Sequence, residues 1–400
     1  MRFAESSKLS LRCLSLRGVG RPTKVARPRH VTSESMIELT RYDTTESPTM
    51  PHPGPRPPST VLARTPTLRG WLLASPVLAI AFIPLFANWQ AASRRGDTTT
   101  RDFARDLLNS VEPYAVIVTA GDNDTFPIWY AQQVEGVRKD VVIAVTSLLN
   151  TDWYARQIVR APVSEYDEAR GPAIYRGRHW PKPTAPPVTL TLNEVDQVPP
   201  YVRLTEPQLF QAGNIRAEIA PGYLEKADIL VLRMIKDNTG RPIYFSRTTG
   251  DYPHRLGLGP YLLTQGLARK LLPNVPTAGR DTVLAAGEGF VDVPRSVALW
   301  TDVFRGQQAL IAKNDWPDRA SVNIPVLYAA TGALLGGVLN SGGQPRLAKE
   351  IIDTSERIVA AARMTDIFPS GVRWTVPLEV PSSDAPRATT LSPPERPKSK

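Results

Sequence analysis

The pattern of apolar and polar positions becomes regular after residue 101. Phe103, Leu107, Leu108 and Val111 recur at the three- and four-residue spacing of a helical face. The next apolar segment, 114–119, is continuous and rich in β-branched residues. Such runs are typical of strands that are buried in a parallel sheet. The start of this region therefore predicts a helix followed by a buried strand.

A second apolar run, 141–146, follows a polar turn at 120–125 and a helical pattern at 126–134. Strand, turn, helix and strand within about 33 residues predict a βαβ unit with a right-handed crossover. A third short strand is predicted at 242–246. The chain is therefore expected to fold as an α/β protein with a Rossmann-like sheet.

The remaining pattern predicts further helices. Segments 151–159 and 224–236 fit helices, whereas the proline-rich stretch 161–221 fits irregular chain with one short strand at 188–192. The stretch 257–273 is compact and apolar. Two long helical patterns, 322–339 and 347–362, are joined by a short Gly-containing loop and predict an antiparallel helical hairpin.

An apolar run near the N-terminus predicts a single transmembrane helix. Residues 71–87 carry no charge, and as a helix they would span roughly 26 Å, slightly less than a bilayer core. Trp71 and Trp89 flank the run, as interfacial aromatics do. Pro76 and Pro84 are better tolerated in a membrane helix than in a soluble one. The alternatives are a buried core helix and an uncleaved signal-type anchor.

The excess positive charge lies mostly before this run. Residues 1–69 contain 12 Lys and Arg but 5 Asp and Glu, within a formal net charge of +10 for the whole chain. The more basic flank favours the cytoplasmic side, which places the rest of the chain outside. The head reads as a basic disordered tail, transit-like in composition, or as translated sequence upstream of a misplaced start.

These patterns give a domain layout and exclude some functions. A folded basic face with stacking aromatics is missing, so a nucleic-acid partner is not expected. Cys13 is the single cysteine, which excludes an internal disulfide and a cysteine metal site. The predicted layout is a disordered head (1–66), a transmembrane helix (69–90), an extracytoplasmic α/β domain (92–275), a helical C-terminal region (276–370) and a disordered tail (371–400).

Polar side chains follow each of the three predicted strands. Because ligands bind at the carboxyl ends of parallel strands, these side chains should meet at one edge of the sheet. Carboxylates there suit a divalent cation, and carboxylates and amides also bind sugar hydroxyls. Trp153 could stack on a sugar ring, although core packing is its alternative role. The candidate ligand-binding residues are Asp122, Asn123, Asp124, Asn150, Asp152, Trp153 and Arg247.

An alternative interpretation of the same residues is purely structural. Asp122, Asp124, Asn150 and Asp152 all precede predicted helices, where Asp and Asn are common N-caps. The turn is not a dinucleotide fingerprint, because Gly121 is its one glycine. The four histidines show no metal spacing, and neither a cofactor nor a bound metal is predicted beyond the divalent cation considered above.

Several of these segments carry a family resemblance. They are Arg94–Asp97, Asp102–Ala104, Gly121–Thr125, Glu135–Val141, Leu148–Tyr154, Arg241–Phe245, 257–258 and Tyr261–Leu262. In this order they resemble the region after the last membrane span in the domain of unknown function 2723 family. That family is grouped with glycosyltransferase family 117 and is similar to protein O-mannosyltransferases. The resemblance implies a soluble C-terminal half, often with TPR-like helices, which the predicted hairpin would suit.

The resemblance transfers no catalytic residue. In such membrane glycosyltransferases the catalytic carboxylate lies in the first extracytoplasmic loop, and no residue of this sequence matches that position. We therefore expect an accessory domain that binds glycan or acceptor, anchored by one span in the cell inner membrane with its C-terminal domain in the periplasm. Its expected partners are the lipid bilayer and a polytopic glycosyltransferase or lipid-linked sugar. The alternatives are a metal-dependent hydrolase or transferase using Asp122, Asp124 and Asp152, and a scaffold whose hairpin docks a partner.

Overall fold

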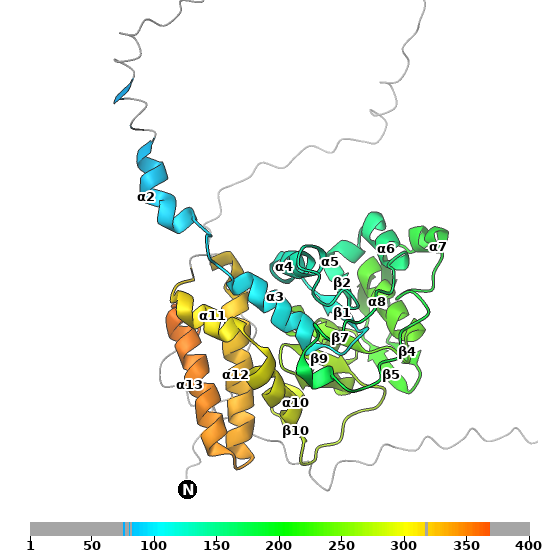
Figure 1. Cartoon of the computed structure of the whole chain (residues 1–400). Helices are drawn as coiled ribbons and strands as arrows, with labels where there is room; N and C mark the ends of the chain where they lie inside the picture. The colour runs from blue at the N-terminus through cyan, green and yellow to red at the C-terminus, as the bar shows by residue number, and fades with distance from the viewer. Residues whose placement is uncertain (1–74, 77–79, 81, 317–318, 369–400) are drawn as a thin grey trace, which may run out of the picture. The chain divides into compact units, whose positions relative to one another are not determined.

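The computed structural model describes residues 75–76, 80, 82–316 and 319–368 (Figure 1). The chain divides into two compact units, residues 1–93 and residues 94–400. The predicted disordered head (1–66) and tail (371–400) lie outside the described residues, as does much of the predicted transmembrane segment (69–90).

The described helix of the first unit is α2 (Phe82–Ala92). It contains no charged residue, and its large apolar side chains are exposed: Ile83 is 61% exposed, Phe86 76% and Trp89 62%. A helix that presents apolar side chains all round needs an apolar environment. The helix fits the predicted membrane span, which stays a prediction.

A different helix has the length and composition to cross a membrane. Among the described residues, Arg319–Ser341 is the one helix that is long and apolar enough, and 78% of its apolar window is buried inside the protein. This segment contains α12 (Asn323–Ser341), which packs along α13 (Pro345–Ala361). Most of its apolar side chains are therefore packed in the protein core.

Three parallel strands form the part of the sheet that the sequence predicts. The strand β1 (Val116–Thr119) lies between β2 (Val142–Val145) and β7 (Ile243–Ser246) and pairs with both in parallel. Every residue of the three strands is buried. The predicted parallel arrangement is confirmed. Apolar β-branched runs favour it because helices cover both faces of a parallel sheet and keep these side chains out of water.

The sheet continues on the β7 side as a mixed sheet of seven strands in the order β10-β11-β8-β9-β7-β1-β2. The strand β9 (Ala268–Leu271) is antiparallel to β7 and to β8 (Leu262–Gln265). The strand β11 (Gly289–Asp292) is parallel to β8 and antiparallel to β10 (Thr282–Ala285). Strands from both sides of the predicted boundary at residue 275 thus share one sheet.

Several predicted elements of the middle region are wrong. The predicted strand at 188–192 is absent, because Thr191 instead caps α7 (Leu192–Gln197) through a capping box with Glu194. The stretch expected to be irregular holds two antiparallel pairs. One of their strands, β5, alternates buried apolar and exposed charged residues, and the prediction overlooked this pattern. These pairs are β3 (Tyr201–Leu204) with β6 (Gly222–Glu225) and β4 (Gln208–Ala212) with β5 (Ile215–Ile219).

The helices that surround the sheet match the predicted ones to within a few residues, apart from α4, which begins four residues earlier than expected, and the short α5, which was not predicted. They are α3 (Thr99–Ser110), α4 (Asp122–Gln133), α5 (Thr146–Leu149), α6 (Asp152–Val159) and α8 (Lys226–Asp237). Shorter helices are α9 (Tyr252–Arg255), α10 (Val293–Ala298), the π-helix Leu299–Val303, α11 (Gly306–Lys313) and the 3₁₀ turns Ala173–Tyr175, Arg247–Thr249, Gly259–Tyr261 and Arg319–Ser321.

The predicted helical hairpin is present as α12 and α13, which lie side by side (Figure 1). Close packing between them depends on glycines in α12. A Cβ at Gly332 would lie 2.0 Å from Ser355 Oγ, and one at Gly336 would lie 2.5 Å from Ile352 Cγ1. Glycine is therefore required where the two helices approach most closely.

Candidate functional site

The loops after β1, β2 and β7 leave the same edge of the sheet. Thr119 pairs with Val145 at the ends of β1 and β2, and Val118 pairs with Phe245 near the end of β7. Parallel strands in this register release their following loops side by side. The edge that the sequence assigned to ligand binding therefore exists as a structural feature.

Asp124 is the buried acid of this edge, with 1% of its surface exposed. Its Oδ2 accepts hydrogen bonds from the Ala120 amide, at 3.2 Å, and from the Thr248 hydroxyl. Since the one hydroxyl proton of Thr248 is donated to Asp124, Thr248 Oγ1 accepts from the Ser246 hydroxyl, 2.7 Å away. The other carboxyl oxygen, Oδ1, has no hydrogen-bond partner. Burial raises the pKa of Asp124 to about 6, against the lowering effect of the Thr248 hydroxyl.

Asp124→Asn should change the pH dependence of stability. Because the native pKa is raised from 3.8 to about 6, the stability linked to this proton is complete below pH 3.8 and is lost as pH rises through 6. Relative to wild type, the variant should gain up to about 3 kcal/mol of unfolding free energy between pH 4 and pH 7. Urea unfolding across this range measures it. The exposed neighbour Asp122→Asn is the control, and parallel curves for both variants would contradict the prediction.

Asn123 and Arg247 bind the C-terminal region of the chain. Asn123 Nδ2 donates to the Ala320 carbonyl and to Asn323 Oδ1, both at 3.0 Å. Arg247 is buried and donates to Thr331 Oγ1 at 2.8 Å and to Glu288 Oε2 at 3.0 Å. These two predicted ligand-binding side chains therefore hold α12 and the β10–β11 turn against the edge of the sheet.

Asn150 and Asp152 bind the beginning of α8. Asn150 donates to Glu225 Oε2 at 2.7 Å and accepts from the Ala227 amide at 2.9 Å. Asp152 Oδ1 accepts from the buried Lys226 ammonium at 2.7 Å, while most of the Asp152 side chain stays exposed. The loop after β2 is thus fixed by residues that lie about 75 positions later in the chain.

None of the four candidate capping residues occupies the N-cap of the helix that follows it. The N-cap of α4 is Gly121, with φ of 89°, and the N-cap of α6 is Thr151, and neither makes a side-chain cap. The simple capping interpretation is wrong for both helices. Asn150 does satisfy an amide in a first helical turn, but this turn belongs to α8.

Aromatic rings adjoin the polar loops, and the sequence interpretation missed most of them. Phe126, Tyr130 and Trp153 are exposed, Trp129 is half-buried and Tyr154 is buried. Phe126 and Trp129 of α4 lie 5.9 Å apart, Trp129 and Tyr154 6.1 Å, and Tyr154 and Trp153 5.5 Å, measured between ring centroids. We call Phe126, Trp129, Tyr130, Val134, Trp153 and Tyr154 the aromatic face. Phe126, Tyr130 and Val134 recur every four residues, and this spacing was the available signal.

The candidate metal ligands are not assembled. Among the residues that the structure describes, no group of three or more His, Cys, Asp and Glu side chains could hold a metal ion. Asp124 is buried beside Thr248, Asp152 pairs with Lys226, and Asp122 is exposed at the start of α4. The three carboxylates of the metal hypothesis therefore have separate surroundings.

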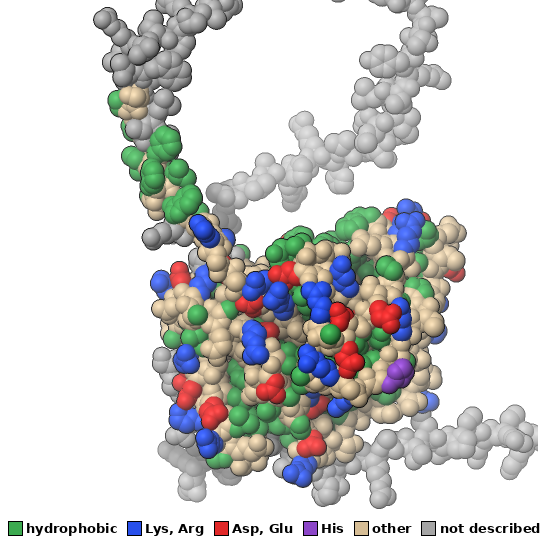
Figure 2. Space-filling model, viewed as in Figure 1, with side chains coloured by type: hydrophobic (Ala, Val, Ile, Leu, Met, Phe, Trp, Pro, Cys, Tyr) green, Lys and Arg blue, Asp and Glu red, His purple; other side chains and the backbone are tan. Residues whose placement is uncertain are grey.

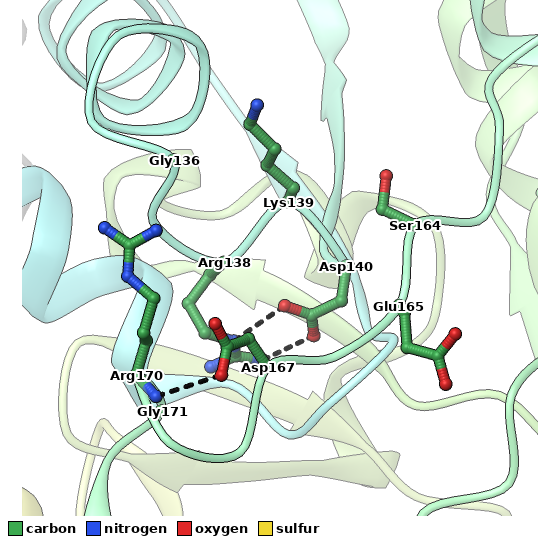
Figure 3. A pocket seen from close by; sticks show the side chains of 9 residues that line it. All are labelled: Gly136, Arg138, Lys139, Asp140, Ser164, Glu165, Asp167, Arg170 and Gly171. Atoms are coloured by element: carbon green, nitrogen blue, oxygen red, sulfur yellow. Dashed lines mark hydrogen bonds and ion pairs between the residues drawn. The ribbon is translucent and has the colours of Figure 1, made fainter.

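A cavity of about 250 Å³ lies at the opposite edge, beside the residues that precede β2 (Figure 3). Its lining includes Arg138 and Asp140, which form a buried ion pair at 3.0 Å. Lys139 and Arg170 also line it. Because Arg138 and Asp140 neutralise each other, this pair offers neither a free cation nor a free acid to a ligand in the cavity.

Comparison with known proteins gives a partial match in this same region. Residues 100–169 match a family model described as TMEM260-associated domain 2. The chain is also 29% identical over 90 residues to the mouse protein O-mannosyl-transferase TMEM260. That match covers 22% of this chain and 12% of the mouse protein. No solved structure gives a significant match.

The family match covers nearly all of α3 and the whole of β1, α4, β2, α5 and α6. It therefore includes the first two polar loops, the aromatic face and the buried pair of Arg138 and Asp140. The narrower labels, domain of unknown function 2723 and glycosyltransferase family 117, stay predictions from the sequence motifs. The family model relates residues 100–169 to a TMEM260-like family, and the 90-residue match to the mouse protein agrees with this.

Proposed function

We propose that this chain is a membrane-tethered, extracytoplasmic accessory domain of a glycosyltransferase system and binds a lipid-linked sugar or its acceptor. The observation that carries the proposal is the match of residues 100–169, which include the βαβ unit, to the TMEM260-associated family model. The partial similarity of the chain to a protein O-mannosyl-transferase supports it. A Rossmann-like identity for this unit and a TPR-like role for the hairpin belong to the same proposal.

The exposed polar groups of the edge supply the binding chemistry. Of the predicted ligand-binding residues, Asp122 is exposed, the Asp152 side chain is 68% exposed, and Trp153 is 55% exposed. Carboxylates accept hydrogen bonds from sugar hydroxyls, and such charge-assisted bonds are stronger than neutral ones. Asp124, Asn123, Asn150 and Arg247 hold this edge in place through the bonds described above.

The proposal separates binding from catalysis. The one buried acid of the edge, Asp124, has a pKa raised by burial, but its accepting oxygen is occupied by Thr248 and the Ala120 amide. An accessory role needs no acid and base pair for proton transfer. It needs surface groups that bind the sugar, such as Asp122 and Asp152. The catalytic groups would then belong to a partner glycosyltransferase.

Binding of polyprenyl-phosphate mannose to the full chain in nanodiscs tests the proposal. The wild-type chain should bind this lipid. The double variant Asp122→Ala, Asp152→Ala should bind it more weakly, with a dissociation constant raised about tenfold or more, as expected for lost hydrogen bonds to charged groups. Asp281→Ala, an exposed acid elsewhere on the domain, is the matched control.

Two outcomes would contradict the proposal. Wild-type chain that binds neither polyprenyl-phosphate mannose nor a mannose-acceptor peptide would remove the binding role. Mannose transfer to the peptide by the purified chain alone would replace the accessory role with an enzymatic one.

A further inference from the structure

The outer side of α4 presents apolar side chains to the surroundings. Phe126 is 58% exposed, Tyr130 47% and Val134 69%, while Ile128 and Ala131 of the same helix are fully buried. Trp153 of α6, 55% exposed, continues this surface. Figure 2 shows apolar side chains gathered along the upper rim of the folded part, in the region of α4 to α6.

The aromatic face is continuous across two helices. Trp129 contacts Phe126 on one side and Tyr154 on the other, and Tyr154 contacts Trp153. The buried Tyr154 hydroxyl donates to the Ile143 carbonyl at 2.7 Å, which fixes the ring relative to β2. Tyr154 itself is buried, so it links the exposed Trp153 ring to α4 from beneath the surface. The exposed rings of Phe126, Tyr130 and Trp153 are therefore held on a rigid support, and exposed apolar side chains gathered in this way mark an interaction site.

The first turns of α3 lie beside the C-terminal end of this face. Arg105 forms an ion pair with Glu135 at 2.8 Å, and Arg101 approaches the same carboxylate at 3.9 Å. Glu135 directly follows Val134, the last apolar residue of the face. The start of α3 and the end of α4 are thus neighbours within the second unit.

The tether between α2 and α3 is short. Asp97, which precedes α3, accepts hydrogen bonds from Thr99 and forms an ion pair with Lys313. Since α2 ends at Ala92, five peptide steps reach from α2 to this fixed residue and span at most roughly 18 Å. Chain length alone therefore keeps the start of α3 near the end of α2, in whatever orientation the two units take.

We propose that the aromatic face docks on the lipid headgroup region of the bilayer that α2 enters. The proposal rests on the membrane tether of the proposed function. Phe, Tyr and Trp side chains are the residues that favour the interface between headgroups and acyl chains. Arg101, Arg105, Lys139 and Arg170 lie near the Val134 end, where cations can meet lipid phosphates. Docking there presents Asp122 and Asp152 at the depth of a lipid-linked sugar.

Site-specific fluorescence in nanodiscs tests the docking. In a Cys13→Ser background, which removes the single cysteine, Phe126→Cys, Trp153→Cys, Phe86→Cys and Leu209→Cys each receive an environment-sensitive fluorophore in the full chain. The nanodiscs contain phosphatidylcholine and phosphatidylglycerol with a nitroxide on the headgroup. Leu209 is the matched control, because it is an exposed apolar residue, 68% exposed, on β4.

The proposal expects labels at positions 126 and 153 to be quenched about twofold or more by the nitroxide lipid, as expected for groups within the headgroup region. The label at 209 should be little affected. Quenching at 86 without quenching at 126 and 153 would overturn the docking and leave the tether intact. Absence of quenching at 86 would overturn both the tether and the docking.

Discussion

Replacing Arg138 with alanine should lower the free energy of unfolding by about 4 kcal/mol, as expected when one partner of a buried ion pair is removed. Side-chain exposure is 2% for Arg138 and 1% for its partner Asp140. Arg138 donates to Asp140 Oδ1 and Oδ2, both at 3.0 Å. Without the guanidinium, the carboxylate would stay buried with the Tyr114 amide as its remaining described donor.

Arg138 also completes the end of α3. Its NH1 donates to the carbonyls of Leu108 and Val111, at 2.9 and 3.0 Å, and its NH2 donates to the Glu112 carbonyl at 3.0 Å. The last carbonyls of a helix have no partner within the helix, so this side chain replaces the missing donors. Arg138 therefore joins the end of α3 to the segment that leads into β2.

Urea unfolding of the full chain measures this effect, and two variants serve as controls. Arg138→Lys keeps the charge but loses the planar set of donors, so it should recover less than half of the loss. Arg105→Ala removes a half-buried arginine of the same region, whose ion pair with Glu135 is only partly shielded from solvent, and should cost at most about 1 kcal/mol. Equal losses of unfolding free energy for Arg138→Ala and Arg105→Ala would show that the buried network contributes no more to stability than the Arg105 ion pair.

The parallel core could be predicted from sequence because local composition determines it. The runs that become β1 and β2 are apolar and β-branched, and they are separated by a helix of the length that a crossover requires. The hairpin of α12 and α13 follows from two long helical patterns with a Gly-containing loop. In both cases the signal lies within a few tens of residues.

The roles of the polar loop residues could not be predicted, because their partners are distant in sequence. Asn123 bonds to Asn323, 200 residues away, and Asn150 bonds to Ala227, 77 residues away. A spacing pattern reports which residues share an edge, but it does not report what packs over that edge. The strands β10 and β11 were missed for a different reason. Their side chains are mostly half-buried and show no clear alternation.

Asp106→Ala should cost about 4 kcal/mol of unfolding free energy at pH 5, because it leaves several buried donors without an acceptor. The Asp106 carboxyl is 1% exposed and lies on α3. It accepts from the Arg305 amide at 2.9 Å, from the Gly306 amide at 2.7 Å and from the Tyr328 hydroxyl at 2.6 Å. One side chain thus joins α3 to the start of α11 and to α12.

The cost should depend on pH in a defined direction. Burial raises the pKa of Asp106 from 3.8 to about 7, against the lowering effect of its three donors. The stability linked to its proton is therefore complete below pH 3.8 and is lost as pH rises through 7. Because the alanine variant has no such proton, the difference between wild type and variant should be smaller at pH 8 than at pH 5.

Denaturant unfolding at both pH values, followed by probes in the sheet and in the helical hairpin, measures the prediction. Tyr328→Phe removes one donor and leaves the carboxyl, so it should cost only about 1 to 2 kcal/mol. If the Asp106 contacts join the two regions into one cooperative unit, both probes should report the same loss. A loss confined to the hairpin, or a cost that grows from pH 5 to pH 8, would contradict this account, since a buried carboxyl that binds its proton more tightly in the native state stabilises the fold most when protonated.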